Sequence, residues 1–116
     1  MQYEIIPTPK FEKDLKRLSK KDRGIIQDIE AVLNLLENGI FQGKVIPMKL
    51  KDNNNITIKI RIASTSKKLG KSSAYRLICY AEKQNGNIYL LTIYSKNEKE
   101  NITNKEILEL ILKYCM

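Results

Sequence analysis

The chain has 116 residues, of which 42% are hydrophobic and 29% are charged. These values are typical of one globular domain over residues 1–116 and exclude a disordered chain, and no apolar run approaches the roughly 20 residues that a membrane-spanning helix needs. The net charge of +8 is concentrated in residues 51–85, which hold eight Lys and Arg against two Asp and Glu. Such a local excess favours a polyanionic partner such as nucleic acid and, with no export signal, a cytoplasmic protein without membrane contact.

The reactive side chains are limited in kind. The chain has no histidine, and its two cysteines, Cys79 and Cys115, are far apart and outside any CxxC pair. This set does not make a zinc site and excludes a catalytic triad that needs an imidazole. We expect two free thiols, no metal and no cofactor.

The N-terminal third predicts a short strand followed by two helices. The strand covers residues 2–7, and Thr8 is a suitable N-cap for the first helix. Apolar residues then recur at helical spacing over residues 11–18 and 25–36, and the second helix is expected to end at the Asn38-Gly39 pair. We expect the two helices to form a hairpin packed on a sheet.

The rest of the chain predicts four further strands and a final helix. The strands are expected over residues 45–50, 56–62, 75–83 and 87–94, and the helix over 104–114. The sequence at 51–55 predicts a turn, and Asn85-Gly86 predicts a type I′ hairpin. The resulting class is α+β: an antiparallel-rich sheet of four to five strands, with the N-terminal helical hairpin packed on one face and a C-terminal helix.

A cluster of cations is predicted on one face of this sheet. Residues 56–62 place isoleucine at every second position, so Lys59 and Arg61 project together from the opposite face, about 6–7 Å apart. Arg76 in the next strand can join them, because Tyr75 beside it points the other way. We expect an open, cationic face that binds an anion. Taken singly, each of these residues is more often an ordinary solvated strand charge.

The loop that follows the strand predicted over residues 56–62 is also basic. Lys67, Lys68 and Lys71 flank Gly70 among small polar residues. This composition suits contacts with a phosphate backbone that position RNA without reading its sequence. A solvated loop with no ligand is the alternative.

Three segments together resemble a known family. They are IKIRIAS at 58–64, KSSAYRLIC at 71–79 and IYLLTIYSKNEKENIT at 88–103. This series resembles the RelE/ParE superfamily of type II toxins, and more closely its RelE-type, HigB-like branch. The likeness spans residues 56–100, with a compatible helical hairpin before them.

The resemblance implies a microbial RNase fold and a function. It implies a metal-independent endoribonuclease (an mRNA interferase) that cuts mRNA in the ribosomal A site and so inhibits translation. Its partners would be the ribosome with its mRNA and a cognate antitoxin of helix-turn-helix type, with operator DNA bound only through the antitoxin complex. Cleavage by 2′-hydroxyl attack needs a general base, stabilisation of a pentacoordinate dianion and a general acid.

The resemblance also assigns roles to residues. The two strand cations of the family correspond to Lys59 and Arg61, its next arginine to Arg76, and its cation after the last strand to Lys96. A lysine among like charges has a lowered pKa, so Lys59 is the expected base, with Lys96 as the other candidate. The arginines suit the phosphate. Tyr94 could stack on a base or orient a proton, or it could simply pack on the terminal helix.

The chain departs from the family at one place, and two other functions stay open. RelE toxins carry a tyrosine a few residues after the last cation, whereas residues 97–103 contain none, so that Tyr94 or Tyr114 would have to replace it. One alternative is a ParE-like toxin that inhibits gyrase, although such toxins generally lack the full set of strand cations. The other is a non-catalytic RNA- or ribosome-binding module.

Overall fold

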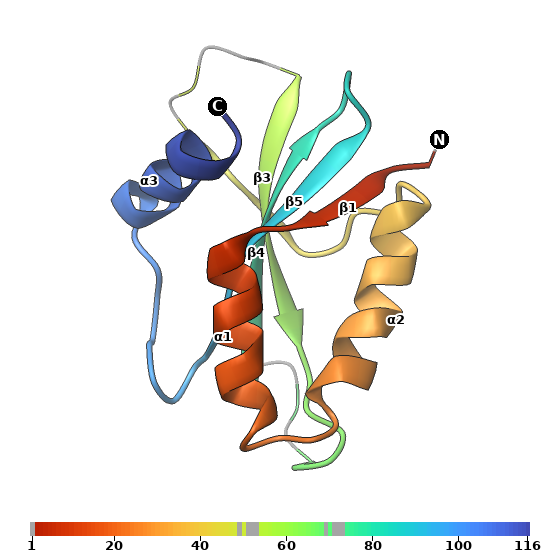
Figure 1. Cartoon of the computed structure of the whole chain (residues 1–116), viewed down its shortest axis with the longest axis vertical. Coiled ribbons are helices and arrows are strands. Elements are labelled where there is room, and N and C mark those ends of the chain that lie inside the picture. The colour runs from red at the N-terminus through yellow and green to blue at the C-terminus, as the bar shows by residue number, and fades with distance from the viewer. Residues whose placement is uncertain (1, 49, 51–53, 69, 71–73) are drawn as a thin grey trace.

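The computed structural model of the chain describes residues 2–48, 50, 54–68, 70 and 74–116. Strands and helices follow one another in the predicted order (Figure 1). The elements are β1 (Glu4–Pro7), α1 (Pro9–Ser19), α2 (Ile25–Glu37), β2 (Lys44–Ile46), β3 (Asn55–Ile62), β4 (Tyr75–Glu82), β5 (Asn87–Ser95) and α3 (Asn104–Tyr114).

The five strands form one mixed sheet in the order β1-β5-β4-β3-β2. β1 runs parallel to β5, and the other neighbouring pairs are antiparallel. The predicted α+β class with an antiparallel-rich sheet is therefore confirmed. The strand expected over 45–50 is shorter than predicted, since β2 spans Lys44–Ile46. The turn expected over 51–55 lies largely outside the described residues.

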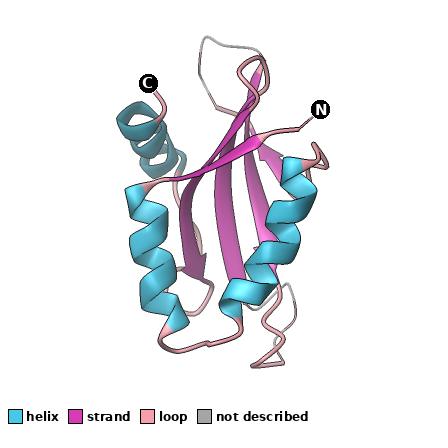
Figure 2. Cartoon of the chain, turned by 45° about the vertical axis from the view of Figure 1, so that its right-hand side comes forward, coloured by secondary structure: helices cyan, strands magenta, loops and turns pink. Residues whose placement is uncertain are grey.

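The two N-terminal helices begin and end close to the predicted positions. The Thr8 side chain caps α1 by accepting a hydrogen bond from the Phe11 amide at 3.3 Å. The chain leaves α2 through Gly39, whose φ of +76° is favourable only without a Cβ atom. Both helices lie on the same side of the sheet (Figure 2). The predicted helical hairpin on one face is therefore confirmed.

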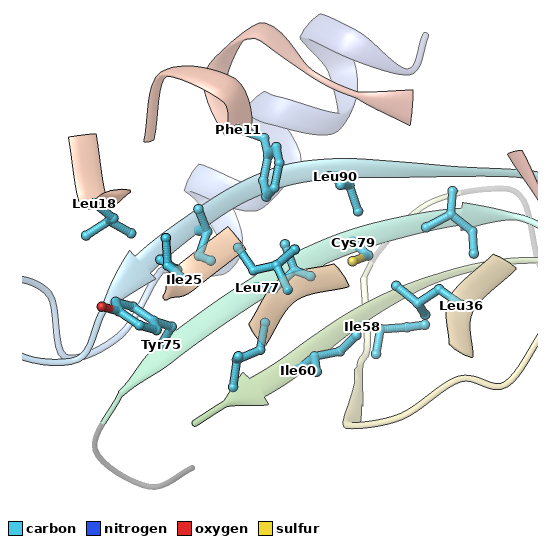
Figure 3. Close-up of a cluster of buried hydrophobic side chains, with 14 of the residues drawn as sticks. Phe11, Leu18, Ile25, Leu36, Ile58, Ile60, Tyr75, Leu77, Cys79 and Leu90 are labelled. Carbon is cyan, nitrogen blue, oxygen red and sulfur yellow. The ribbon is translucent and has the colours of Figure 1, made fainter. Parts of the chain in front are cut away.

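The main core lies between these helices and the sheet. Phe11 and Leu18 of α1 and Ile25 and Leu36 of α2 point down onto the strands, as Figure 3 shows. Residues from three strands meet them: Ile58, Ile60, Ile62, Leu77, Cys79, Leu90 and Ile93. Each of these side chains is at most 4% exposed. The alternation of isoleucines in β3 therefore marks the core side of the sheet, as predicted.

The opposite face is only partly open, which corrects the prediction of an open, cationic face. α3 packs on this face, where Ile107 and Ile111 contact Ile78 and Leu91. The reason lies in β4, whose residues are buried on both faces along nearly its whole length. A strand that is apolar on both sides needs cover on both sides. The uncovered part of this face is centred on β3.

The hairpin between β4 and β5 differs from the predicted type I′ turn. Glu82 pairs with Asn87, so four residues, 83–86, form the loop, and the Gly86 amide donates to the Glu82 carbonyl at 2.9 Å. Gly86 has a φ of +69°, whereas Asn85 has a negative φ. The two-residue type I′ prediction is therefore wrong, because only one residue of this longer loop is left-handed.

Both cysteines are free, as predicted. Burial raises the pKa of the Cys79 thiol and raises that of Cys115 to about 12. Neither thiol is therefore ionised at neutral pH. Among the described residues, no helix combines the length and the apolar character that crossing a membrane requires.

Candidate functional site

Three of the residues singled out in the sequence lie in one row across the sheet. Arg61 of β3 is directly opposite Arg76 of β4, and Arg76 is directly opposite Tyr94 of β5. Directly opposite residues share a face, with Cβ atoms about 4.5–5.5 Å apart. The register therefore brings two guanidinium groups and a phenol together on the α3 side of the sheet.

A second row of charge lies two residues earlier in β3. Lys44 of β2 is directly opposite Lys59 of β3. Lys44 is exposed and Lys59 is half-buried. The Lys59 Nζ atom donates a hydrogen bond to Oδ1 of Asn101, just before α3, at 3.3 Å. Lys59 thus lies between Lys44 on one side and the two arginines on the other.

In this environment, Lys59 has a lower pKa than a free lysine. Burial lowers its pKa, and the positive charges of Arg76, Arg61 and Lys44 lower it further. The predicted direction of the shift is therefore confirmed, although burial, rather than like charge, is its largest cause. A lysine with a lowered pKa is neutral in a larger fraction of molecules, and only the neutral amine can accept a proton.

Arg76 is more deeply buried than was expected for a residue of an open cationic face. Its side chain is 4% exposed, and its Nη1 atom donates to the Tyr75 carbonyl at 3.1 Å. Burial lowers the pKa of its guanidinium, and Arg61 opposite lowers it further, although arginine remains charged. A phosphate can therefore reach Arg76 only after its neighbours move. Its positive charge also lowers the pKa of Lys59.

Tyr94 packs beneath the terminal helix. It is 4% exposed and belongs to the cluster formed with Ile107 and Ile111. In the described part of the chain, its hydroxyl is the one buried polar side-chain atom without a hydrogen bond of good geometry. Burial raises the pKa of this phenol, while the Ile102 amide and Arg76 oppose that rise. Tyr94 thus stays protonated at neutral pH.

Lys96 follows β5 at the same end of the sheet as Arg76. Its backbone amide donates to the Ala74 carbonyl at 3.0 Å, and its side chain is exposed. Lys67 and Lys68 are also exposed, while Lys71 lies outside the described residues. Lys67 lines a hollow of about 270 Å³ together with Ser95 and Asn97, the two neighbours of Lys96. The basic loop therefore approaches the end of β5 where Lys96 lies.

Two open hollows flank Lys59. One has a volume of about 480 Å³ and is lined by Gly43, Lys44 and Arg61 in addition to Lys59. The other, of about 260 Å³, lies towards the start of α3 and shares Lys44 and Lys59 with the first. Space on both sides of a cation allows a chain of phosphates to run across it.

The sequence reasoning did not identify Lys44 or Asn101. Lys44 stands at the start of a three-residue strand that the pattern placed one residue later, so its pairing with Lys59 was not visible. Asn101 meets Lys59 across 42 residues of sequence, and no local signal reports such a contact.

Among the described residues, no group of three or more His, Cys, Asp or Glu is placed to hold a metal ion. The cations, the phenol and the amide of this site can instead bind phosphate, donate hydrogen bonds and, at Lys59, accept a proton.

Comparison with known proteins supports the fold. No protein-family model and no curated protein matches the chain. Among solved structures, it is similar to a chain of the crystal structure of the E. coli DinJ-YafQ toxin-antitoxin complex, with a TM-score of 0.54 and 12% sequence identity. The similarity covers 87% of this chain and 100% of that one. At this identity it shows a shared fold.

Proposed function

We propose that this protein is the toxin of a type II toxin–antitoxin system, an endoribonuclease of the RelE-type, HigB-like kind that cleaves mRNA in the ribosomal A site. The observation that carries the proposal is the cluster around Lys59, a lysine of lowered pKa beside two arginines and Lys44. The fold it shares with a chain of a toxin–antitoxin complex supports the same reading.

In the proposed reaction, neutral Lys59 is the general base. It takes the proton of a ribose 2′-hydroxyl, whose oxygen attacks the adjacent phosphorus. The bond from phosphorus to the 5′-oxygen of the next nucleotide then breaks. The products are a 2′,3′-cyclic phosphate and a chain with a 5′-hydroxyl, so that no water, metal or cofactor enters the cleavage step.

The arginines supply the charge that this step needs. The pentacoordinate phosphorus carries two negative charges, and a guanidinium binds such a group through two parallel hydrogen bonds. Arg61 is exposed and can meet the phosphate directly. Arg76, next to it and buried, lowers the pKa of Lys59 and would reach the phosphate once substrate has displaced the residues that cover it.

The leaving 5′-oxygen needs a proton from a second group. Lys96 is exposed at the end of β5, and Tyr94 is protonated but covered by α3. We propose Lys96 as the acid, with Tyr94 as the alternative if α3 moves when the ribosome binds. Lys67, Lys68 and Lys71 would contact the phosphates outside the cleaved bond.

The proposed partners are mRNA on the ribosome, in the cytoplasm, and a cognate antitoxin of helix-turn-helix type that blocks the toxin. Operator DNA would be bound only through the antitoxin complex. The burial of Arg76 and Tyr94 favours a second candidate, a non-catalytic RNA- or ribosome-binding module, since such a module needs only the exposed cations.

A purified translation system separates the two candidates. Wild-type protein should cut mRNA on ribosomes much faster than free mRNA, and Lys59→Ala should bind ribosomes but leave the mRNA intact. The cut RNA should end in a cyclic phosphate. Ribosome binding without any cleavage by the wild type would favour the non-catalytic module.

A further inference from the structure

The short connection between α1 and α2 is bonded to the loop that follows β3. Asp22, in this connection, is 2% exposed. Its carboxylate accepts hydrogen bonds from the hydroxyls of Ser64 (2.5 Å), Ser66 and Tyr75 (2.7 Å), and from the Gly24 amide (3.0 Å). A buried carboxylate held by hydroxyl and amide donors keeps its charge without an ion pair.

Two further contacts hold the same loop, one from the first turn of α2 and one at Gly24. The Asp28 carboxylate accepts from the backbone amide of Thr65 at 3.1 Å and from its hydroxyl at 2.7 Å. At Gly24, an added Cβ atom would lie 3.0 Å from the Cβ atom of Ser66, so this glycine allows the loop to approach closely. Ser64 and Ser66 are therefore bonded to the connection between the helices, and Thr65 is bonded to the first turn of α2.

The bonds continue into the basic part of the loop. The Lys67 amide donates to the Ser64 hydroxyl oxygen at 3.3 Å, and the Lys68 amide donates to the Thr65 carbonyl at 3.2 Å. Lys68 has a φ of +55°, a conformation that needs surrounding structure to hold it. Asp22 thus fixes Ser64, which in turn holds the backbone of Lys67.

We propose that Asp22 is a positioning residue for RNA binding, which holds the 64–68 loop so that Lys67 and Lys68 meet RNA phosphates without further ordering. This inference rests on the proposed function. Fixing the backbone of one loop residue at the moment of binding weakens affinity by about tenfold. Loss of the Asp22 contacts should therefore weaken RNA binding while the catalytic groups on β3, β4 and β5 stay in place.

The chain offers a matched control for a buried carboxylate. Asp14 in α1 is 6% exposed and accepts from the Thr92 hydroxyl at 2.6 Å and from the Lys10 ammonium at 3.0 Å. Within the described part of the chain, its hydrogen bonds and ion pairs are with Lys10, Arg17 and Thr92, outside the 64–68 loop. Asp14→Asn should therefore disturb packing to a similar degree as Asp22→Asn without changing how the loop is held.

The test compares both variants with the wild-type chain. The ligand is a single-stranded RNA oligonucleotide with 2′-O-methyl groups, which cannot be cleaved, and binding is titrated at several salt concentrations. Hydrogen exchange of the 65–68 amides is measured in parallel. Asp22→Asn should speed this exchange, weaken binding about tenfold and flatten the salt dependence, and Gly24→Ala should change all three in the same direction.

Each outcome decides one question. If Asp22→Asn binds RNA like wild type, or if Asp14→Asn loses as much affinity, Asp22 has no positioning role. If the wild type itself does not bind the oligonucleotide, the positioning role fails, whereas the proposed function is decided separately by cleavage of mRNA on ribosomes. Faster exchange with unchanged binding shows that Asp22 holds the loop for folding alone, which also overturns the inference.

Discussion

At the scale of single residues, the feature that matters is a lysine held among positive charges. Lys59 is half-buried, lies opposite Lys44 and shares its face with Arg61 and Arg76. Two effects, burial and like charge, favour its neutral form. A chain with no histidine thereby obtains a group that can exchange a proton nearer to neutral pH.

The pH dependence of cleavage reports on this group. Neutral Lys59 becomes more abundant as pH rises, so the single-turnover rate should increase with pH and level off below the ordinary lysine pKa of 10.5. Lys59→Ala should lose activity and its pH dependence, and Lys59→Arg should stay inactive because arginine keeps its proton. A rate that is independent of pH in the wild type would exclude Lys59 as the base.

Substitution of Arg76 separates its two proposed effects. Arg76→Ala removes a positive charge near the reacting phosphate, which should lower the rate by about 10²–10³. It should also raise the pKa of Lys59 and move the pH profile to higher pH, since Arg76 is the strongest charge that acts on Lys59. Arg76→Lys should restore the position of the profile but little of the rate, because lysine lacks the two-pronged guanidinium. Full activity of Arg76→Ala, with unchanged melting, would remove Arg76 from the site.

At the scale of elements, the sequence predicts the order and type of strands and helices because most of them have a clear local signal. The isoleucine alternation of β3 and the Thr8 cap of α1 are such signals. α3 covers the second face of the sheet because β4 is apolar on both faces. The apolar run of β4 indicates burial on both faces only once β4 is known to lie in the middle of the sheet. The contacts of Asp22 and Asn101 join distant loops, and no periodicity predicts them.

The hydrogen bonds of Asp22 also predict how the stability of the fold changes in acid. Burial alone would raise the pKa of its carboxyl, but the bonds from Ser64, Ser66, Tyr75 and Gly24 lower it to about 2. The folded state thus binds this proton less readily than the unfolded state, and the resulting stability is present above pH ~4 and is lost as pH falls towards 2.

This loss of stability in acid is measurable by denaturant unfolding at several pH values. Asp22→Asn should lower the free energy of unfolding at neutral pH by about 2 kcal/mol, and its stability should fall less than that of wild type between pH ~4 and ~2. Parallel acid curves for the two proteins would show that Asp22 does not carry this difference.

At the scale of the whole molecule, the sheet has parts that helices cover and one uncovered part that carries positive charge. α1 and α2 cover one face, α3 covers the β4–β5 part of the other, and the cations of β2 and β3 occupy what remains. Of the basic residues counted in 51–85, Lys59, Arg61 and Arg76 lie on this face. Which of these cations are buried could not be predicted, because burial depends on where α3 docks.

This distribution predicts a strong salt dependence of RNA binding. Each phosphate neutralised on single-stranded RNA adds about 0.7 to the slope of log affinity against log salt. Joint substitution of Lys67, Lys68 and Lys71 by alanine should reduce that slope by about 2 and leave the melting temperature unchanged, since the two described lysines are exposed. An unaltered slope would show that these lysines are solvated and do not contact RNA.

The central claim is that the cation cluster directs a 2′-hydroxyl at the neighbouring phosphate of ribosome-bound mRNA. The most direct measurement uses a programmed ribosome whose A-site codon carries one 2′-deoxynucleotide at the mapped cleavage position. The all-ribose message should be cut there to give a cyclic phosphate, and the 2′-deoxy message should remain intact while binding the protein equally well. Equal cleavage of both messages would contradict this account.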